Sequence, residues 1–397
     1  MIAVEEALRL IQEEQNVITE TETIATQEAL GRVLSKSIQA PLALPSFRQS
    51  AMDGYALHMG TGLNYTVIGE QKAGDAKPFD LKAGECIRIF TGAAVPDTAN
   101  VVVIQEKVKR FENKIELENL PQLGQNVRAQ GTQIKKGSFP LEKGQMLNPA
   151  GLGLIQSLGI QKVEVFRKPR VCVIVTGNEL LPPGSTLSEG KIFESNSLIL
   201  KAALHQIQIE PQIITGVPDR LEDTVDVLKG AFATSDLVLI SGGISVGDYD
   251  FVGKALQNLS VKDIFYKVRQ RPGKPLYFGK KGNTYCFALP GNPASTLTCF
   301  YVYVLPLLNR LRNFGSLGLR REKLPLTQDF QSSEARALFL KAAVNRGKVS
   351  LLDHQNSSML ISFAKANAVV FLPENGASLK KHEKVEVLFL PDFNESS

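Results

Sequence analysis

Hydrophobic residues in the middle of the chain form short unbroken runs that alternate with amphipathic segments. The runs "RVCVIVTGNEL", "EPQIITGVP" and "DLVLISGG" predict buried strands, and "NSLILKAALHQI", "RLEDTVDVLKGAF" and "YDFVGKALQNL" predict helices between them. A further strand over residues 284–289 leads into "ASTLTCFYVYVLPLL", which predicts a buried helix. Strands rich in Val, Ile and Leu that alternate with helices favour a parallel sheet covered on both faces. The pattern therefore predicts an α/β module over residues 167–315.

The sequence on either side of this module has a different pattern. Residues 1–45 begin with the acidic amphipathic helix "MIAVEEALRLIQEEQN" and end on the proline-punctuated "APLALPSF". Residues 46–135 predict strands, including a hairpin with its tip near Glu112 and Asn113. Residues 136–166 are linker-like and contain a short helix from about Pro149 to Leu158. Residues 316–397 return to short strands separated by "NRGK" and "ENGA", as in a small β-barrel.

Composition narrows the functional classes. The chain has 397 residues, enough for two to four domains, and a net charge of only +5, which gives no case for a nucleic acid partner. The longest apolar run, residues 298–308, is too short to span a bilayer, and the N-terminal helix does not resemble a signal peptide. Four histidines make a zinc site or a histidine triad unexpected. We expect a cytoplasmic protein without a membrane partner, whose four cysteines are buried free thiols: Cys86, Cys172, Cys286 and Cys299.

Glycine-rich and acidic loops follow the predicted parallel strands at their carboxyl ends. These loops are "TGNEL", "GVPD", "SGGISVGDYD" and "LPGNP". Ligands of open α/β sheets bind at that edge, where glycines let backbone N–H groups approach phosphate. The carboxylates in these loops are candidate ligands of Mg²⁺: Glu179, Asp219, Asp248 and Asp250. For Asp219, an N-cap of the following helix is an equally good interpretation.

Two proline-containing turns suggest an anion site. In "LPGNP", Asn292 suits an N-cap and Pro293 the first helical position, while Gly291 leaves the helix start bare for an anion. The alternative is an ordinary turn between a strand and a helix. In "RPGKP", prolines and a glycine favour a rigid turn that holds Arg271 and Lys274 close together. The alternative there is a solvated basic strand, since residues 267–281 contain no acid.

Six ordered motifs carry a resemblance to a known family. "SAMDGYAL", "RIFTGAAVP", "VTGNEL", "SGGISVGDYD", "PGKP" and "LPGNP" occur in the order found in the molybdopterin molybdenumtransferases, the MoeA and gephyrin E-domain family. The resemblance extends over essentially the whole chain, including "SSMLISFAKANAVVFLP". With it, the expected fold is an elongated N-terminal and linker domain (1–45 and 136–166), an inserted β-rich domain (46–135), the three-layer α/β module with a mostly parallel sheet (167–315), and a C-terminal β-barrel (316–397).

The resemblance implies an enzyme that inserts molybdate into adenylylated molybdopterin with Mg²⁺ and releases AMP. The implied catalytic residues are Asp53, Thr91, Glu179, Asp250 and Lys274. The implied pocket for the pterin substrate comprises Gly177, Gly242, Gly243, Ser245, Asp248, Pro290, Gly291, Asn292, Pro293 and Arg128. Glu179 and Asp53 match Mg²⁺ ligands, and the molybdate site is matched by Arg271, Lys274, Ser295, Arg336 and Ser358, with Ser357 beside it.

The chain departs from the family at one point, and two other functions remain open. Thr132 and Gln133 replace an acidic pair found in many relatives, and a glutamine carries no charge. The alternatives are a molybdopterin adenylyltransferase and a non-catalytic cofactor-binding or scaffold protein. The resemblance also implies a homodimer in which residues 46–135 of one subunit face the α/β module of the other. A molybdopterin adenylyltransferase is a further expected partner.

Overall fold

The computed structural model describes residues 1–14, 16–75, 77–244, 251–315 and 318–391. It contains two compact units. The first comprises Met1–Glu22 with Phe166–Ser397, and the second comprises Thr23–Val165. Ser245, Asp248 and Asp250, three of the predicted site residues, lie outside the described residues.

A six-stranded mixed sheet forms the centre of the first unit. Its order is β14 (Gln212–Val217), β11 (Val171–Thr176), β15 (Leu237–Ser241), β19 (Thr284–Leu289), β18 (Tyr277–Lys281) and β16 (Lys262–Tyr266). The first four strands are parallel, and the last two add antiparallel pairs at one edge. The mostly parallel α/β sheet predicted from the sequence is therefore confirmed. The hydrophobic runs become strands because side chains on both faces of β11, β15 and β19 are buried.

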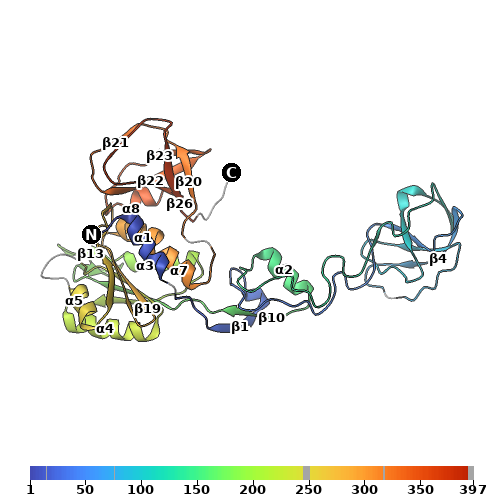
Figure 1. Cartoon of the computed structure of the whole chain (residues 1–397), viewed down its shortest axis with the longest axis horizontal. Helices are drawn as coiled ribbons and strands as arrows, with labels where there is room; N and C mark the ends of the chain where they lie inside the picture. The colour runs from blue at the N-terminus through green and yellow to red at the C-terminus, as the bar shows by residue number, and fades with distance from the viewer. Residues whose placement is uncertain (15, 76, 245–250, 316–317, 392–397) are drawn as a thin grey trace. The chain divides into compact units, whose positions relative to one another are not determined.

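Helices cover both faces of this sheet (Figure 1). Val171, Val173 and Val175 of β11 belong to one hydrophobic cluster, whereas Cys172 and Ile174 belong to another. The alternation follows from the two-residue period of a strand. The first face carries α3 (Asn196–Gln206), α6 (Pro293–Cys299), α7 (Leu305–Leu311) and α1 (Val4–Glu13). The second carries α4 (Leu221–Thr234) and α5 (Phe251–Asn258). Between α6 and α7, Phe300–Val304 form a π-helical turn.

The position of α1 corrects one predicted boundary. Residues 1–45 were expected to form a domain with residues 136–166, but residues 1–22 belong to the unit that contains the α/β module. Val4, Ala7 and Ile11 form an apolar stripe at helical spacing, and all three are buried in the hydrophobic cluster that includes Leu308 of α7. The apolar face of α1 is therefore buried against the α/β module.

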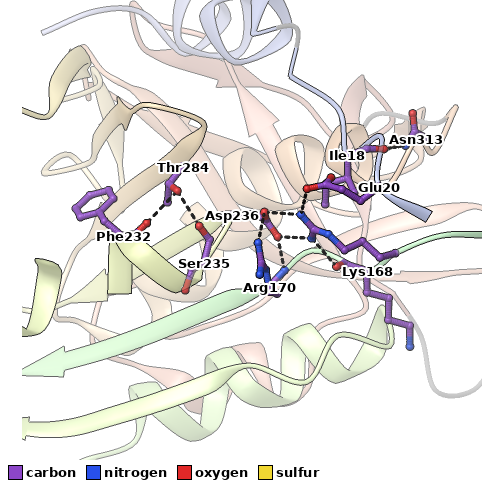
Figure 2. Close-up of polar contacts among 10 residues, drawn as sticks. Ile18, Glu20, Lys168, Arg170, Phe232, Ser235, Asp236, Thr284 and Asn313 are labelled. Carbon is purple, nitrogen blue, oxygen red and sulfur yellow. Dashed lines mark hydrogen bonds and ion pairs between the residues drawn. The ribbon is translucent and has the colours of Figure 1, made fainter. Parts of the chain in front are cut away.

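The chain passes between the two units twice, and an ion-pair network connects the residues next to both points with Asp236, just before β15. Arg167 donates to both carboxylate oxygens of Asp236, at 2.6 and 2.9 Å, and to Glu20 at 3.1 Å. Figure 2 shows Asp236 next to Glu20 and Arg170, and the backbone N–H of Arg170 donates to it at 2.7 Å. Burial opposes ionisation of Asp236, but these hydrogen bonds outweigh it and lower the pKa of its carboxyl. Glu20 lies just before the chain leaves this unit, and Arg167 just after it returns.

Two sheets form the C-terminal part of the same unit. The larger has the order β17 (Gln270–Arg271), β22 (Ala337–Asn345), β24 (Ala368–Leu372), β26 (Lys384–Phe389) and β20 (Arg321–Pro325), with β23 (Lys348–Leu351) paired to β22. The smaller pairs β21 (Phe330–Ser332) with β25 (Ala377–Leu379), and α8 (Leu360–Phe363) is the helix of this region. The short strands predicted from the sequence are present, and their closure into a barrel stays a prediction.

The second unit has its own sheet, with the order β6 (Val101–Ile104), β3 (Gly54–Leu57), β5 (Glu85–Ile89), β4 (Asn64–Gln71), β8 (Lys114–Leu117) and β7 (Val108–Phe111). The predicted hairpin is confirmed, since β7 and β8 pair around Glu112 and Asn113. Also in this unit are the pair β2 (Gln49–Ser50) with β9 (Val127–Arg128), and α2 (Pro149–Ser157). The pair β1 (Thr21–Ala25) with β10 (Lys162–Phe166) begins and ends at the boundary.

The cysteine prediction is confirmed, because all four thiols are free and buried. Burial raises the pKa of the Cys86 and Cys299 thiols to about 12, so both stay protonated at neutral pH. Of the helices in the described ranges, none is long and apolar enough to cross a bilayer.

Candidate active site

The site begins where the strand order of the α/β sheet reverses. β14 lies on one side of β11, and the next strand of the chain, β15, lies on the other side. Such a switch leaves a crevice at the carboxyl ends of the two diverging strands. Gly177 follows β11 there, and Gly242 follows β15. The sequence-predicted loops "TGNEL" and "SGG" therefore meet at one edge of the sheet.

Gly242 and Gly243 are required by close packing of these loops. A Cβ atom on Gly242 would lie 2.3 Å from the carbonyl oxygen of Thr176, and one on Gly243 would lie 2.7 Å from Val252 Cγ2. Both residues also have positive φ angles, +91° and +63°. A larger residue would strain the backbone and push the loop away from β11.

The first cleft, which we name the glycine cleft, has a volume of about 370 Å³. Its lining includes Thr176, Glu179, Glu194, Asn196, Ser241, Gly242, Gly291, Asn292, Pro293 and Ser358. The buried Asn196 side chain connects its walls, because its Nδ2 donates to Ser241 Oγ at 2.8 Å and to the Gly291 carbonyl at 2.7 Å. The predicted pocket residues Gly242, Gly291, Asn292 and Pro293 are thus brought together.

The two acids after β11 and β14 have different environments. The carboxylate of Glu179 lies 2.9 Å from the position that a Cβ on Gly177 would occupy, so the glycine makes room for it. Asp219 accepts hydrogen bonds from Thr176 Oγ1 at 2.8 Å and from the N–H of Asn178 at 3.0 Å. The N-cap interpretation of Asp219 is wrong, since Arg220 holds that position without a side-chain cap. Asp219 instead fixes the loop that carries Glu179.

Glu179 is the carboxylate of this cleft that fits a magnesium ion. Glu194, the other acid of the lining, accepts from the N–H of Ser197 at 2.8 Å at the start of α3, whereas no described residue pairs with the Glu179 carboxylate. Within the described ranges there is no group of three His, Cys, Asp or Glu that could hold a metal alone. Mg²⁺ is commonly held by one or two carboxylates together with phosphate oxygens of a substrate. The donor set fits an ion shared with a substrate.

A second cleft, which we name the oxyanion cleft, adjoins the first along Asn292 and Ser358 and has a volume of about 450 Å³. Its lining comprises Gln270, Arg271, Pro272, Gly273, Lys274, Pro275, Pro290, Asn292, Ser295, Arg336, Asn356, Ser357 and Ser358. Strand pairing assembles it: Gln270 and Arg271 pair in parallel with Ala337 and Leu338. This pairing brings Arg271 beside Arg336. The structure thus unites all five predicted molybdate-site residues.

The "RPGKP" turn is rigid because buried polar groups hold it from behind. Gln270 Nε2 donates to the carbonyls of Pro272 and Gly273 at 3.0 and 3.2 Å, and Tyr303 donates to its Oε1. Gly273 has φ +87°, and a Cβ there would lie 2.6 Å from Cys299 Sγ. Arg271 and Lys274 both line the cleft, as the turn interpretation predicted. Residues 267–281 thus contain both predicted features: a turn held by buried groups, and strands on either side of it, β17 and β18.

The start of α6 differs from the sequence prediction in its partners. Pro293 is the first helical residue and Asn292 holds the N-cap position, as predicted, but the Asn292 side chain does not cap the helix. Its Nδ2 donates to Ser357 Oγ at 2.9 Å, and the N–H of Ser295 donates to the Ser357 carbonyl at 3.2 Å. The helix start is therefore partly occupied by the loop at Ser357 and is not bare. The cationic side chains that line the cleft are therefore the main groups available to bind an anion.

Positive charge dominates the oxyanion cleft. Arg271, Lys274 and Arg336 face it, and none of the described acids pairs with Lys274. Glu334 pairs with Arg271 at 3.2 Å and with Arg336 at 2.8 Å. The hydrogen bond from Arg336 is the main reason that the pKa of Glu334 is lowered, so Glu334 is ionised at neutral pH. One carboxylate against three cations leaves a site suited to a dianion.

Sequence reasoning missed a buried lysine behind the serine loop. Lys341 of β22 is 1% exposed, and its Nζ donates to the carbonyls of His354 and Asn356 at 3.0 and 3.2 Å. Burial lowers the pKa of Lys341 to about 8. The ammonium thereby fixes the segment that presents Ser357 and Ser358. A single lysine at the centre of the apolar run "ALFLKAAV" is the signal that could have revealed it.

Two of the predicted residues of the second unit, Asp53 and Thr91, are hydrogen-bonded to each other. Asp53 Oδ1 accepts from the N–H of Thr91 at 2.8 Å and from its Oγ1 at 2.7 Å. The backbone hydrogen bond, followed by that of the hydroxyl, lowers the pKa of Asp53. Arg128 is exposed in β9 and pairs in register with Gln49 of β2. Asp53 thus presents an ionised, exposed carboxylate.

The fold and the clefts define a class: an α/β protein with a glycine-lined cleft at the switch point of its sheet and a cation-lined cleft alongside. Family models give the class its name. "MoeA N-terminal region (domain I and II)" matches residues 2–159, "Probable molybdopterin binding domain" matches residues 172–310, and "MoeA C-terminal region (domain IV)" matches residues 323–390.

Individual relatives agree with these matches over the whole chain. The molybdopterin molybdenumtransferase of Haemophilus influenzae is 32% identical and is aligned over 98% of both chains. That of Staphylococcus epidermidis is 32% identical over 98% of this chain and 95% of the relative. The crystal structure of the MoeA protein of molybdopterin biosynthesis from Pyrococcus horikoshii OT3 is similar with a TM-score of 0.84 and 30% identity, covering 98% of this chain and 100% of that one. The chain belongs to the molybdopterin molybdenumtransferase, or MoeA, family, and is thereby an enzyme of molybdenum cofactor biosynthesis.

Proposed function

We propose that this enzyme inserts molybdate into adenylylated molybdopterin and releases AMP. The observation that carries the proposal is the adjacency of the two clefts along Asn292 and Ser358. One cleft has the backbone loops that suit a pterin phosphate, and the other has the cations that suit molybdate. A phosphate bound in the first would lie beside an oxyanion bound in the second.

In this proposal, the residues of the oxyanion cleft have distinct parts. Arg271, Lys274 and Arg336 hold the molybdate dianion by charge-assisted hydrogen bonds. Ser358 donates from its hydroxyl at the boundary of the two clefts, and the buried Ser295 supplies a second hydroxyl from α6. Together they orient the oxyanion toward the pterin.

Glu179 is the proposed ligand of Mg²⁺ in the glycine cleft, and the ion would stabilise negative charge on the phosphoanhydride. Glu179 would orient the adenylylated substrate through its carboxylate. Asp219 holds the loop of Glu179 in place through Thr176 and Asn178. Ser245, Asp248, Asp250, Pro290 and Arg128 complete the proposed set of residues for the pterin substrate, with Asp250 in a catalytic part.

The direct test is incubation of the purified protein with adenylylated molybdopterin and Mg²⁺, with and without molybdate, while AMP is measured. We expect AMP release only when molybdate is present. AMP release at the same rate with and without molybdate would contradict the proposal. Synthesis of the adenylylated compound from molybdopterin and ATP would instead identify an adenylyltransferase, and binding without turnover would identify a scaffold.

We further propose a cytoplasmic homodimer in which Asp53 and Thr91 of one subunit serve the clefts of the other. Symmetric dimers are the commonest oligomers. Homodimers of Asp53→Ala and of Lys274→Ala would each be nearly inactive, whereas a mixed dimer would keep one intact site. Random exchange makes about half of the dimers mixed, so roughly a quarter of the wild-type activity should return. No recovery after confirmed exchange of tagged subunits would contradict shared sites.

A further inference from the structure

Glu334 lies between the two arginines of the oxyanion cleft, although it does not line the cleft itself. Its Oε2 accepts from Arg271 Nη1 at 3.2 Å, and its Oε1 accepts from Arg336 Nε at 2.8 Å. We propose that Glu334 is a positioning residue that sets the orientation of both guanidinium groups for a tetrahedral dianion. The inference rests on the proposed function only for the identity of that dianion.

The choice of donor atoms supports this role. An arginine has five N–H donors in a planar fork, and one pair of them can bind two oxygens at once. Glu334 accepts a hydrogen bond from Nε of Arg336, so the terminal pair of that arginine, Nη1 and Nη2, remains available. It accepts from Nη1 of Arg271, so Nε and Nη2 of that arginine remain available. Within the described part of the chain, no other acceptor is bound to either guanidinium. Each arginine therefore keeps one pair of N–H groups for a ligand.

The two arginines need such a common partner. Arg271 comes from β17 and Arg336 from the residue before β22, so the pairing of these strands fixes the two backbones but not the orientation of the two long side chains. Both side chains are long and partly exposed, with exposed fractions of 52% and 35%. Two like charges in one cleft repel each other, and the Glu334 carboxylate between them offsets that repulsion. The backbone N–H of Glu334 donates to Ser332 Oγ at 3.2 Å, which anchors the residue to β21.

An opposite role for Glu334 leads to an opposite prediction. If the carboxylate merely competed with the ligand for the arginines, its neutralisation would tighten the binding of every dianion. If it orients the arginines, Glu334→Gln weakens binding. The amide has one acceptor oxygen, and its NH₂ group would face a guanidinium that it cannot serve. The sign of the change therefore separates the two roles.

The experiment measures the dissociation constants of molybdate and tungstate with the full-length protein by calorimetry. It also measures KM for both substrates and kcat in the AMP assay. We expect Glu334→Gln to raise the molybdate dissociation constant and the molybdate KM about tenfold. The KM for adenylylated molybdopterin should not change. The matched control is Glu374→Gln, which removes a similar ion pair to Arg269 (3.0 Å) outside the cleft lining and should leave both constants unchanged.

A double-mutant cycle tests whether Glu334 acts through the arginines. In an Arg336→Gln background, Glu334→Gln should cost at least threefold less in molybdate affinity than in the wild type. Additive losses, unchanged affinity or tighter binding by Glu334→Gln would each overturn the inference. So would a wild type that binds neither anion. Oxyanion binding without AMP release would contradict the proposed reaction and leave this test intact.

Discussion

The two clefts on either side of Asn292 and Ser358 are built by opposite means. The glycine cleft depends on missing side chains: Gly242 lies where a Cβ would be 2.3 Å from a carbonyl oxygen. The oxyanion cleft depends on side chains that carry charge, with Arg271 and Arg336 oriented by one carboxylate. Substitutions in the first should therefore act on the fold of the loops. Substitutions in the second should act on the binding of an anion.

The largest effect is expected from Gly242→Ala in the glycine cleft. The new methyl group would collide with the Thr176 carbonyl at a positive φ, so the loop must move away from β11. We expect about 3 kcal/mol or more lost from the free energy of unfolding, together with loss of activity. Chemical denaturation measures the first and AMP release the second.

Gly291→Ala is the matched control, because a Cβ there would meet its nearest neighbour, Gly242 Cα, at an ordinary 3.8 Å. Its stability should stay within about 0.5 kcal/mol of the wild type. Equal stability losses for the two variants would show that the loop does not depend on the close approach of Gly242.

The next largest effect is expected from Lys274→Ala in the oxyanion cleft. Loss of a charge-assisted contact of about 1.5–3 kcal/mol should weaken molybdate binding at least tenfold, with the free energy of unfolding nearly unchanged. Calorimetry with molybdate and denaturation with guanidinium measure the two quantities. An affinity equal to that of the wild type would remove Lys274 from the site.

A smaller effect is expected from Lys341, which supports one wall of the oxyanion cleft: it should make the free energy of unfolding depend on pH. Burial lowers the pKa of Lys341 to about 8 in the folded protein, from the ordinary lysine value of 10.5. Between these values the unfolded chain binds a proton that the folded chain does not. Stability therefore rises with pH across this window and is unaffected by this group below it.

Removal of the lysine should abolish that rise. Relative to Lys341→Met, the wild type should gain roughly 1–3 kcal/mol in the free energy of unfolding from pH 7.5 to pH 10.5. Lys348→Met, which removes an exposed lysine of β23, serves as the control. The same pH dependence in the wild type and Lys341→Met would contradict a lowered pKa.

The strands and turns that depend on local sequence pattern could mostly be predicted from the sequence. The runs of Val, Ile and Leu in β11 and β15 are recognisable because both faces of these strands are buried. The "RPGKP" turn is recognisable because prolines and a positive-φ glycine restrict its backbone. Order along the chain then places the loops at one edge of the sheet. These features need no knowledge of distant partners.

The contacts that complete the site are not predictable in this way. Asn292 bonds to Ser357, 65 residues away, and not to its own helix. Glu334 meets Arg271 over 63 residues. Asp219 reaches the loop after β11 across 43 residues. Such pairs leave no periodicity in the sequence, because they depend on how separate elements pack. The resemblance to the family supplied Arg336 and Ser358, but not the residues that hold them.

The most direct measurement of the central claim is anomalous diffraction from crystals of the protein soaked in tungstate, a heavy analogue of molybdate. The account predicts one strong anomalous peak in the oxyanion cleft, within hydrogen-bond reach of Arg271, Lys274 and Arg336. The peak should disappear in crystals of Lys274→Ala soaked under the same conditions. A strong peak elsewhere, with the oxyanion cleft empty, would contradict the account.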